Sequence, residues 1–202
     1  ICSNAGFLGN PIAQGVFGMM GLTLASIYLI PQRIMMWSEG VSVFTEAPTK
    51  KEMLKKIFTH PCIIACEIGI VLMLTGWRPP HFLEETITSV SNCNTAMSML
   101  VIGMILADAD PKTIIDKDVL FYTFIRLLII PFCVFIPCWL LHTDSLVMGV
   151  SVILAAMPAG ATTTILASKY DCEEEFSVKL VVFSTAASLI TTPLWNMILL
   201  KF

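Results

Sequence analysis

Long apolar segments, separated by short polar ones, place the strongest limit on how this chain can fold. The hydrocarbon core of a bilayer needs about 20 helical residues to cross, and within lipid only helices or closed barrels satisfy their backbone groups. Hydrophobic residues make up 56% of the chain and charged residues 13%, far from the globular average. The sequence therefore predicts an all-α polytopic membrane helix bundle. The expected spans are 1–21, 22–44, 61–77, 85–107, 119–141, 146–170 and 176–201.

Lysines in the polar linkers indicate how these spans are oriented. The linker at residues 45–60 is rich in lysine, and basic loops of this kind lie on the cytoplasmic side of a membrane. If successive spans alternate in direction, Lys112, Lys117 and Lys169 fall on that same side. This agreement supports the predicted spans. The chain divides accordingly into residues 1–44, the cytoplasmic linker 45–60 and residues 61–202.

Composition also argues against several classes of function. The formal net charge is -3 and the basic residues are scattered, unlike the concentrated positive surface of a nucleic-acid-binding protein. His, Cys and carboxylate residues show no metal-ligand spacing, and the Met and aromatic residues form no cofactor motif. The chain begins ICSNAGFLGNP, without an initiator Met or the features of a signal peptide. We therefore expect part of a longer integral membrane protein, with no nucleic-acid partner, metal or cofactor.

The stretch AAMPAGATTTILASKYD, residues 155–171, interrupts an apolar segment of membrane length. Pro158 lacks a backbone donor and clashes with the carbonyl of Leu154, and Gly160 makes unwinding easier. About a dozen residues, roughly 17 Å of helix, lie on either side, so the break falls near the bilayer midplane. Unwound backbone there would present polar groups to a solute. The threonines of this stretch are expected to cap the new helix start: Thr162, Thr163 and Thr164.

The first apolar segment has a similar interruption. In SNAGFLGNPIAQGVFG, residues 3–18, the apolar run is broken by Gly6, Gly9 and Pro11. With the predicted topology the two interrupted segments run in opposite directions, which is typical of the inverted repeats of secondary transporters. Either break alone is explained as well by a packing kink as by function. Two breaks with matching geometry favour a solute site between them.

At these residues the sequence resembles the auxin efflux carrier family, which includes plant auxin exporters and bacterial permeases for small carboxylates such as malonate and malate. SNAGFLGNPIAQGVFG is similar to the first crossover segment of that family, MPAGATTTILASKYD to its second and FSTAASLITTPLW to its last helix. The resemblance covers essentially the whole chain. It implies an inverted-repeat transporter fold of five plus five helices, with two broken crossover helices. This chain would be a fragment that lacks about three N-terminal helices.

The resemblance also implies a function and a site. Asn4, Pro11 and Pro158 match by motif the positions beside the substrate, while Asn10 departs from the apolar residue expected before Pro11. The function implied is secondary active transport of a small organic anion, a carboxylate or an auxin-like compound, by alternating access. The partners expected are the lipid bilayer, H⁺ or Na⁺ as a candidate coupling ion and a second copy of the chain in a candidate homodimer. The expected location is the plasma membrane, in particular a bacterial inner membrane.

Arg33 lies about eleven residues from either end of its predicted span, where an ionised side chain is costly and usually faces a cavity or a partner. It could bind a carboxylate substrate through two parallel hydrogen bonds. It could equally form a structural ion pair. The candidate partners for such an ion pair are Glu39, Glu67 and Asp108.

Two further charged residues fall within predicted spans. Glu67 lies about 9 Å into its span and is a candidate proton carrier, or else a silent group. Arg126 lies about seven residues into its span, and we expect its long side chain to extend to the membrane interface.

A stripe of polar residues on the span 85–107 has two interpretations as well. Its members recur at helical spacing and so share one face. They could line a solute pathway, or they could form hydrogen bonds between helices. The stripe consists of Ser91, Asn94, Thr95 and Ser98. A face of small residues on the last span is expected to serve close packing.

Two other classes of function remain as alternatives. A membrane-embedded enzyme is disfavoured, because the chain has no H-E-x-x-H motif, no G-x-S-x-G motif and no paired carboxylates at helical spacing within a span. A truncated, non-transporting membrane protein with a binding or signalling role is the second alternative. Three further spans upstream would favour the transporter.

Overall fold

The computed structural model describes residues 3–36, 61–107, 115–199 and 201, and within α3 and α4 it leaves some side chains undescribed. The described chain is helical apart from turns and one isolated antiparallel bridge, which confirms the all-α prediction. In chain order, with η for a π-helical turn, the elements are η1 (Ala5–Gly9), α1 (Asn10–Met35), α3 (Pro61–Thr75), α4 (His81–Ala107), α5 (Lys117–Phe124), η3 (Ile125–Ile129), α6 (Ile130–Leu140), α7 (Ser145–Ala155), α8 (Ala161–Lys169) and α9 (Glu174–Leu199).

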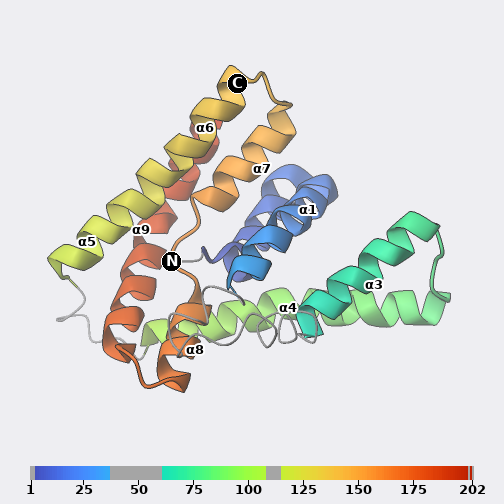
Figure 1. Ribbon diagram of the computed structural model, residues 1–202, viewed down its shortest axis with the longest axis horizontal. Coiled ribbons are helices and arrows are strands. Elements are labelled where there is room, and N and C mark those ends of the chain that lie inside the picture. The colour runs from blue at the N-terminus through green and yellow to red at the C-terminus, as the bar shows by residue number, and fades with distance from the viewer. Residues whose placement is uncertain (1–2, 37–60, 108–114, 200, 202) are drawn as a thin grey trace, which may run out of the picture.

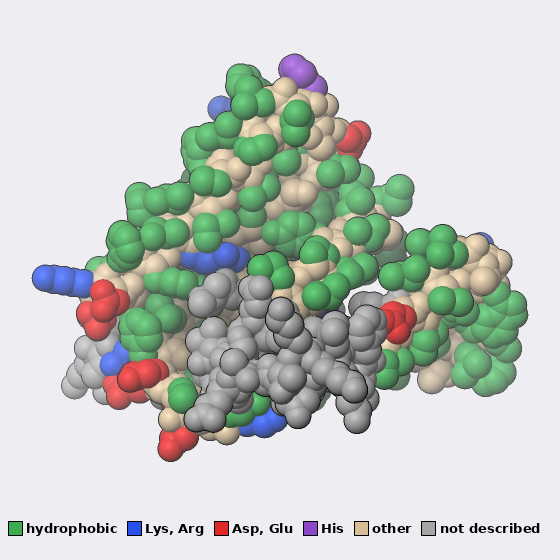
Figure 2. Space-filling view, in the orientation of Figure 1, with side chains coloured by type: hydrophobic (Ala, Val, Ile, Leu, Met, Phe, Trp, Pro, Cys, Tyr) green, Lys and Arg blue, Asp and Glu red, His purple; other side chains and the backbone are tan. Residues whose placement is uncertain are grey.

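Three helical stretches of the described chain are long and apolar enough to cross a membrane: Ala5–Met35, Lys117–Leu140 and Glu174–Leu199. Their outward faces carry large exposed apolar side chains, such as Leu189 and Phe121. Figure 2 shows hydrophobic side chains covering most of the upper part of the molecule, over α6 and α7. Such a surface suits lipid rather than water, so the chain is an integral membrane protein.

The first of these stretches turns back on itself at Gly18. A straight helix from Ala5 to Met35 would hold its ends about 45 Å apart. Instead, the side-chain amide of Gln32 donates a hydrogen bond to the carbonyl of Ser3 at 2.9 Å. Gly18 has φ 68° and ψ -157°, a backbone conformation that only glycine adopts readily. The two predicted spans 1–21 and 22–44 therefore separate at Gly18, three residues before the expected boundary at Gly21.

The predicted break around Gly6, Gly9 and Pro11 is wrong in position. Helix runs continuously through these residues, and the non-helical stretch lies earlier, at Ser3 and Asn4. The proline is accommodated because η1 is a π-helical turn, in which the backbone N–H of Asn10 donates to the carbonyl of Ala5. This wider turn relieves the clash that a proline ring makes with the carbonyl four residues before it.

The predicted break at Pro158 is confirmed. Helix α7 ends at Ala155 and α8 begins at Ala161, with Pro158 between them. The expected threonine cap is wrong, because Gly160 occupies the N-cap position and no side chain caps the helix there. The three threonines lie within the first turn or so of α8. An extended backbone at Gly160 places the helix start one residue before Thr162, so their hydroxyls follow the cap instead of forming it.

Helices α1, α7 and α9 form the centre of the molecule, with α5, η3 and α6 along one side and α4 crossing below (Figure 1). The core is built from the apolar faces of α1 and α7, joined by Trp195 of α9. Trp195 also donates a hydrogen bond from Nε1 to the carbonyl of Leu127 in η3 at 2.9 Å. Pro131, four residues on, has no N–H to donate to that carbonyl. The small-residue face of α9 is buried, as expected for packing: Ser177, Ser184, Ser188 and Thr192.

Candidate functional site

The two unwound stretches of the chain cross each other at the centre of the fold. The backbone N–H of Asn4 donates to the carbonyl of Pro158 at 2.8 Å, and Ser3 pairs with Ala159 in an antiparallel bridge. Asn4 is 3% exposed and Pro158 is fully buried. The structure thus brings together two residues that lie more than 150 positions apart and that the family resemblance placed at the site.

Side chains from two other elements satisfy the backbone of the second unwound stretch. The Nε of Arg126 donates to the carbonyl of Met157 at 3.0 Å. The backbone N–H of Ala159 donates to Ser184 Oγ at 3.1 Å, and that hydroxyl donates in turn to the carbonyl of Leu180 on its own helix. Buried backbone groups that leave a helix need such partners, and here η3 and α9 supply them.

Arg126 corrects one prediction made from the sequence. We expected its side chain to extend to the membrane interface, but it is only 8% exposed and points to the break in the α7–α8 pair. The distance along the span could not reveal this, because depth does not specify which helix face meets the protein interior. Arg126 and its neighbour Leu127 are the buried residues of η3.

A cavity of about 160 Å³ lies beside the crossing. It brings together three residues predicted for the site: Asn4, Arg33 and Thr162. A side chain at Gly6 would approach the guanidinium of Arg33, since a Cβ there would lie 3.5 Å from Nη2. The remaining lining comes from both arms of the reversed helix: Ser3, Phe7, Leu29, Gln32 and Met36.

The polar groups around this cavity are mainly hydrogen-bond donors. Arg33 is half-buried there, and the buried Nδ2 of Asn4 has no hydrogen-bond partner among the described residues. The N-terminal end of α8, where backbone N–H groups point out of the helix, lies next to Thr162. A cation, an amide donor and a helix N-terminus together suit an anionic group.

One of the three ion-pair partners considered for Arg33 is excluded by the structure. Among the described residues the ion pairs join His81 to Glu85 and Lys179 to Glu175, so Arg33 does not pair with Glu67. Glu39 and Asp108, the other two carboxylates considered, lie outside the described residues.

The other predicted site residues do not line this cavity. Asn10 and Pro11 follow η1 at the start of α1, and Gly160 and Thr163 lie at the start of α8. Glu67 is exposed on α3. Asn94 belongs to α4, but its side chain lies outside what the structure describes.

Sequence reasoning did not single out Ser3 or Gln32, and it assigned Ser184 only to the packing face of the last span. Gln32 makes a pair of contacts with Ser3, donating from Nε2 to its carbonyl at 2.9 Å and to Oγ at 3.0 Å. A glutamine beside an arginine in the middle of an apolar span was a usable signal, because amides in a membrane need partners. Ser184 carried no such signal, since serines are common on packed membrane helices.

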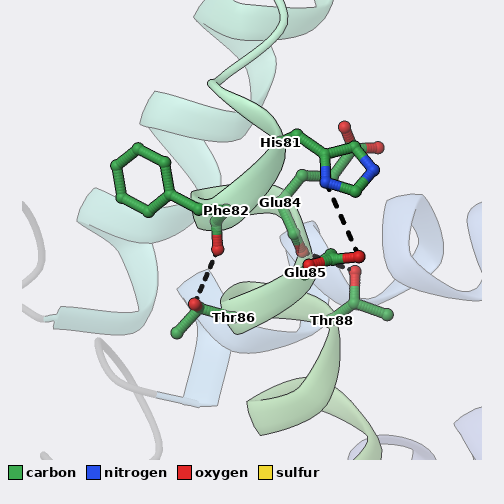
Figure 3. Close-up of polar contacts among 6 residues, drawn as sticks. All are labelled: His81, Phe82, Glu84, Glu85, Thr86 and Thr88. Atoms are coloured by element: carbon green, nitrogen blue, oxygen red, sulfur yellow. Dashed lines mark hydrogen bonds and ion pairs between the residues drawn. The ribbon is translucent and has the colours of Figure 1, made fainter.

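A second group of polar residues lies on α4, away from the crossing. Figure 3 shows His81 facing Glu85, with Nδ1 and Oε1 3.6 Å apart, while Thr86 and Thr88 donate to carbonyls one turn before them. The side chains of His81 and Glu85 are 85% and 69% exposed. Exposed pairs of this kind contribute little to stability, and threonine bonds to the preceding turn are ordinary in helices. The crossing is therefore the stronger candidate site.

Comparison with known proteins identifies the family. The family model described as "Membrane transport protein" matches residues 45–196, which is most of the chain. The protein belongs to this membrane transport family. Helices of membrane length and a broken helix at Pro158 agree with the resemblance to auxin efflux carriers.

Relatives of this membrane transport protein come from archaea, bacteria and plants. An uncharacterized transporter of Methanothermobacter thermautotrophicus is 27% identical over 97% of this chain and 65% of its own length. An uncharacterized transporter of Escherichia coli K12 is 21% identical over 94% of this chain and 63% of its own length. Auxin efflux carrier component 8 of Arabidopsis thaliana is 23% identical over 71% of this chain and 41% of its own length. The chain spans less than two thirds of the length of each of these relatives.

Proposed function

We propose that this protein carries a small organic anion across the membrane by secondary active transport, with the solute bound in the cavity beside the crossing. One observation carries the proposal: Asn4, Arg33 and Thr162, from three separate parts of the fold, line one cavity next to unwound backbone. Membership of a membrane transport family supports it.

The donors around the cavity favour a carboxylate. The guanidinium of Arg33 can donate two parallel hydrogen bonds to one carboxylate. The free Nδ2–H groups of Asn4 and the N-terminal end of α8 can hold a second anionic or polar group. A cavity of about 160 Å³ is smaller than the pockets of about 300 Å³ or more that hold drug-sized ligands. The substrate is therefore expected to be a small mono- or dicarboxylate.

Alternating access is the transport mechanism that we propose for this arrangement. In transporters built from inverted repeats, broken helices hold the solute at mid-membrane while one part of the protein moves against another. We propose that residues 1–44 end the first repeat and residues 61–202 form the second, joined by the cytoplasmic linker 45–60. H⁺ or Na⁺ would drive transport, with Glu67 as the candidate proton carrier, in the plasma membrane of the cell. The linker lies outside the described residues.

The test is uptake of labelled small carboxylates by the full reading frame in proteoliposomes, with and without a pH or Na⁺ gradient. Arg33→Gln removes the charge while keeping a hydrogen-bond donor, and we expect it to raise KM by about 10- to 100-fold, as loss of a charged hydrogen bond would. Arg78→Gln is the matched control, because Arg78 is exposed on the turn after α3. It should leave KM unchanged.

Two results would contradict the proposal. Uptake that is saturable but equal in wild type and Arg33→Gln would make that arginine structural. Binding of carboxylates without uptake would favour the non-transporting alternative, in which the protein has a binding or signalling role.

A further inference from the structure

We propose that Arg126 is a positioning residue for the solute cavity, acting through the carbonyl of Met157. Its guanidinium sets where the unwound stretch between α7 and α8 lies, and that stretch in turn places Asn4 at the cavity wall. The inference rests on the proposed function only for its effect on transport. The positioning itself can be tested without a solute.

Burial of Arg126 needs an explanation, because a charged side chain inside a membrane protein is costly. It is 8% exposed within one of the three membrane-length stretches. Its Nε lies 3.0 Å from the carbonyl oxygen of Met157, which is itself fully buried. A hydrogen bond from a charged donor to a carbonyl is stronger than a neutral one, so this contact can hold a segment that lacks helical hydrogen bonds of its own.

The π-helical turn η3, which carries Arg126, is held in place by α9. Its neighbour Leu127 accepts a hydrogen bond from Trp195 of α9 at 2.9 Å, and Trp195 packs against the rings of Phe132 and Phe135. η3 is therefore attached to α9 directly beside the arginine. Arg126 extends from this anchored turn to the carbonyl of Met157, which lies 31 residues later in the sequence.

The contact between Arg126 and Met157 is connected to the cavity through Pro158 and Asn4. Met157 immediately precedes Pro158, whose carbonyl accepts the backbone N–H of Asn4 at 2.8 Å. Asn4 lines the cavity and presents an unpartnered amide. Arg126 does not line the cavity itself. If the Met157 carbonyl moves, the Pro158 carbonyl moves with it, and the Asn4 side chain shifts relative to Arg33 and Thr162.

Chemical substitution can separate the hydrogen bond from the charge. Glutamine carries Nε2 at the same distance along the side chain as the Nε of arginine, so Arg126→Gln keeps a donor at that place and removes the charge. Lysine has a methylene group there, so Arg126→Lys keeps the charge and loses that donor. Arg126→Met loses both. Arg78→Met, on the exposed turn after α3, is the matched control.

The solute-independent measurement is disulfide formation between Ser3→Cys and Ala159→Cys in the full reading frame, with the seven native cysteines replaced by serine or alanine. Bridged residues of this kind lie about 4.5–5.5 Å apart at Cα, within the range for a disulfide. We expect Arg126→Gln to cross-link within about threefold of the arginine protein. Arg126→Lys and Arg126→Met should cross-link about 10- to 100-fold more slowly.

Equal cross-linking rates in the arginine protein and its Gln, Lys and Met variants would overturn the proposal. A normal rate in Arg126→Lys with a slow rate in Arg126→Gln would also overturn it, because the effect would then depend on charge. The Gln and Lys variants decide the matter even if Arg126→Met does not fold. In the uptake assay, Arg126→Lys should raise KM about tenfold and leave kcat within about twofold. If no carboxylate is transported, the proposed function fails while the cross-linking result still stands.

Discussion

Ser184 shows what one hydroxyl does at the residue scale. The backbone N–H of Ala159 would be buried without a partner in the unwound stretch if Ser184 Oγ did not accept its hydrogen bond. The same hydroxyl donates to the carbonyl of Leu180 at 2.6 Å, so both of its functions are used. Together with Arg126 on Met157, it satisfies backbone groups that an intact helix would have paired.

Replacing this serine is expected to destabilise the protein more than replacing a neighbour. Ser184→Ala leaves the N–H of Ala159 unsatisfied, at a cost of about 1–3 kcal/mol. Ser188→Ala is the matched control, because Ser188 is also buried on α9 but only donates to the carbonyl of Thr185 on the same helix. Thermal unfolding of both variants in detergent tests this, with the larger fall in Tm expected for Ser184→Ala. Equal falls in Tm would mean that the bond to Ala159 contributes nothing specific.

At the scale of elements, glycine allows the start of the first arm to approach α7 closely. A Cβ on Gly9 would lie 2.7 Å from Leu154 Cδ2 and 3.1 Å from Met157 Cγ. A similar contact joins α7 to the same arm, where a Cβ on Gly149 would meet Phe17 at 2.7 Å. These approaches bring the backbone after the first break against the end of α7, and so help to set the crossing.

Two glycines of this arm should therefore respond oppositely to alanine. Gly9→Ala overpacks the contact with α7 and should cost about 1–3 kcal/mol. Gly15→Ala meets no heavy atom within 4 Å and should stabilise the helix by about 0.5–1 kcal/mol. The change in Tm of the purified variants provides the measurement. A stabilised Gly9→Ala protein would show that η1 and α7 are not tightly packed at this point.

At the scale of the whole molecule, the fold has two polar ends separated by apolar faces. The turn between α6 and α7 lies at the top of Figure 1 and the turn between α8 and α9 at the bottom. Lys117 begins α5 and Lys169 ends α8, and the lysines predict that their side faces the cytoplasm. His142 and Cys172 are exposed residues of the two turns.

Thiol labelling can determine this orientation. In the full reading frame without other cysteines, a protein with His142→Cys is expected to react with an impermeant reagent in intact cells. A protein that keeps only Cys172 should react only after permeabilisation, because the lysine-rich side is expected to be internal. The reverse pattern would invert the predicted topology, and labelling of both residues from outside would contradict the alternation of spans.

Some features of this protein follow from the sequence by itself, because their causes are local. The apolar segments predict membrane helices through composition and length. Pro158 predicts a break through its missing N–H, and the structure places the break there. The motifs around both breaks identify the family, and the match over residues 45–196 confirms it. Arg33 could be chosen as a candidate site residue because charged groups are unusual in such spans, and Asn4 was chosen through the family motif.

Other features were decided only by the tertiary structure. The first break lies at Ser3 and Asn4 because the π-helical turn absorbs Pro11, and the start of α8 is capped by Gly160 rather than by threonine. Arg126 is buried because its helix face meets the break. Each of these outcomes depends on which distant groups are brought within hydrogen-bonding distance. Local propensity describes the strain at a break, whereas packing determines which side chains relieve it.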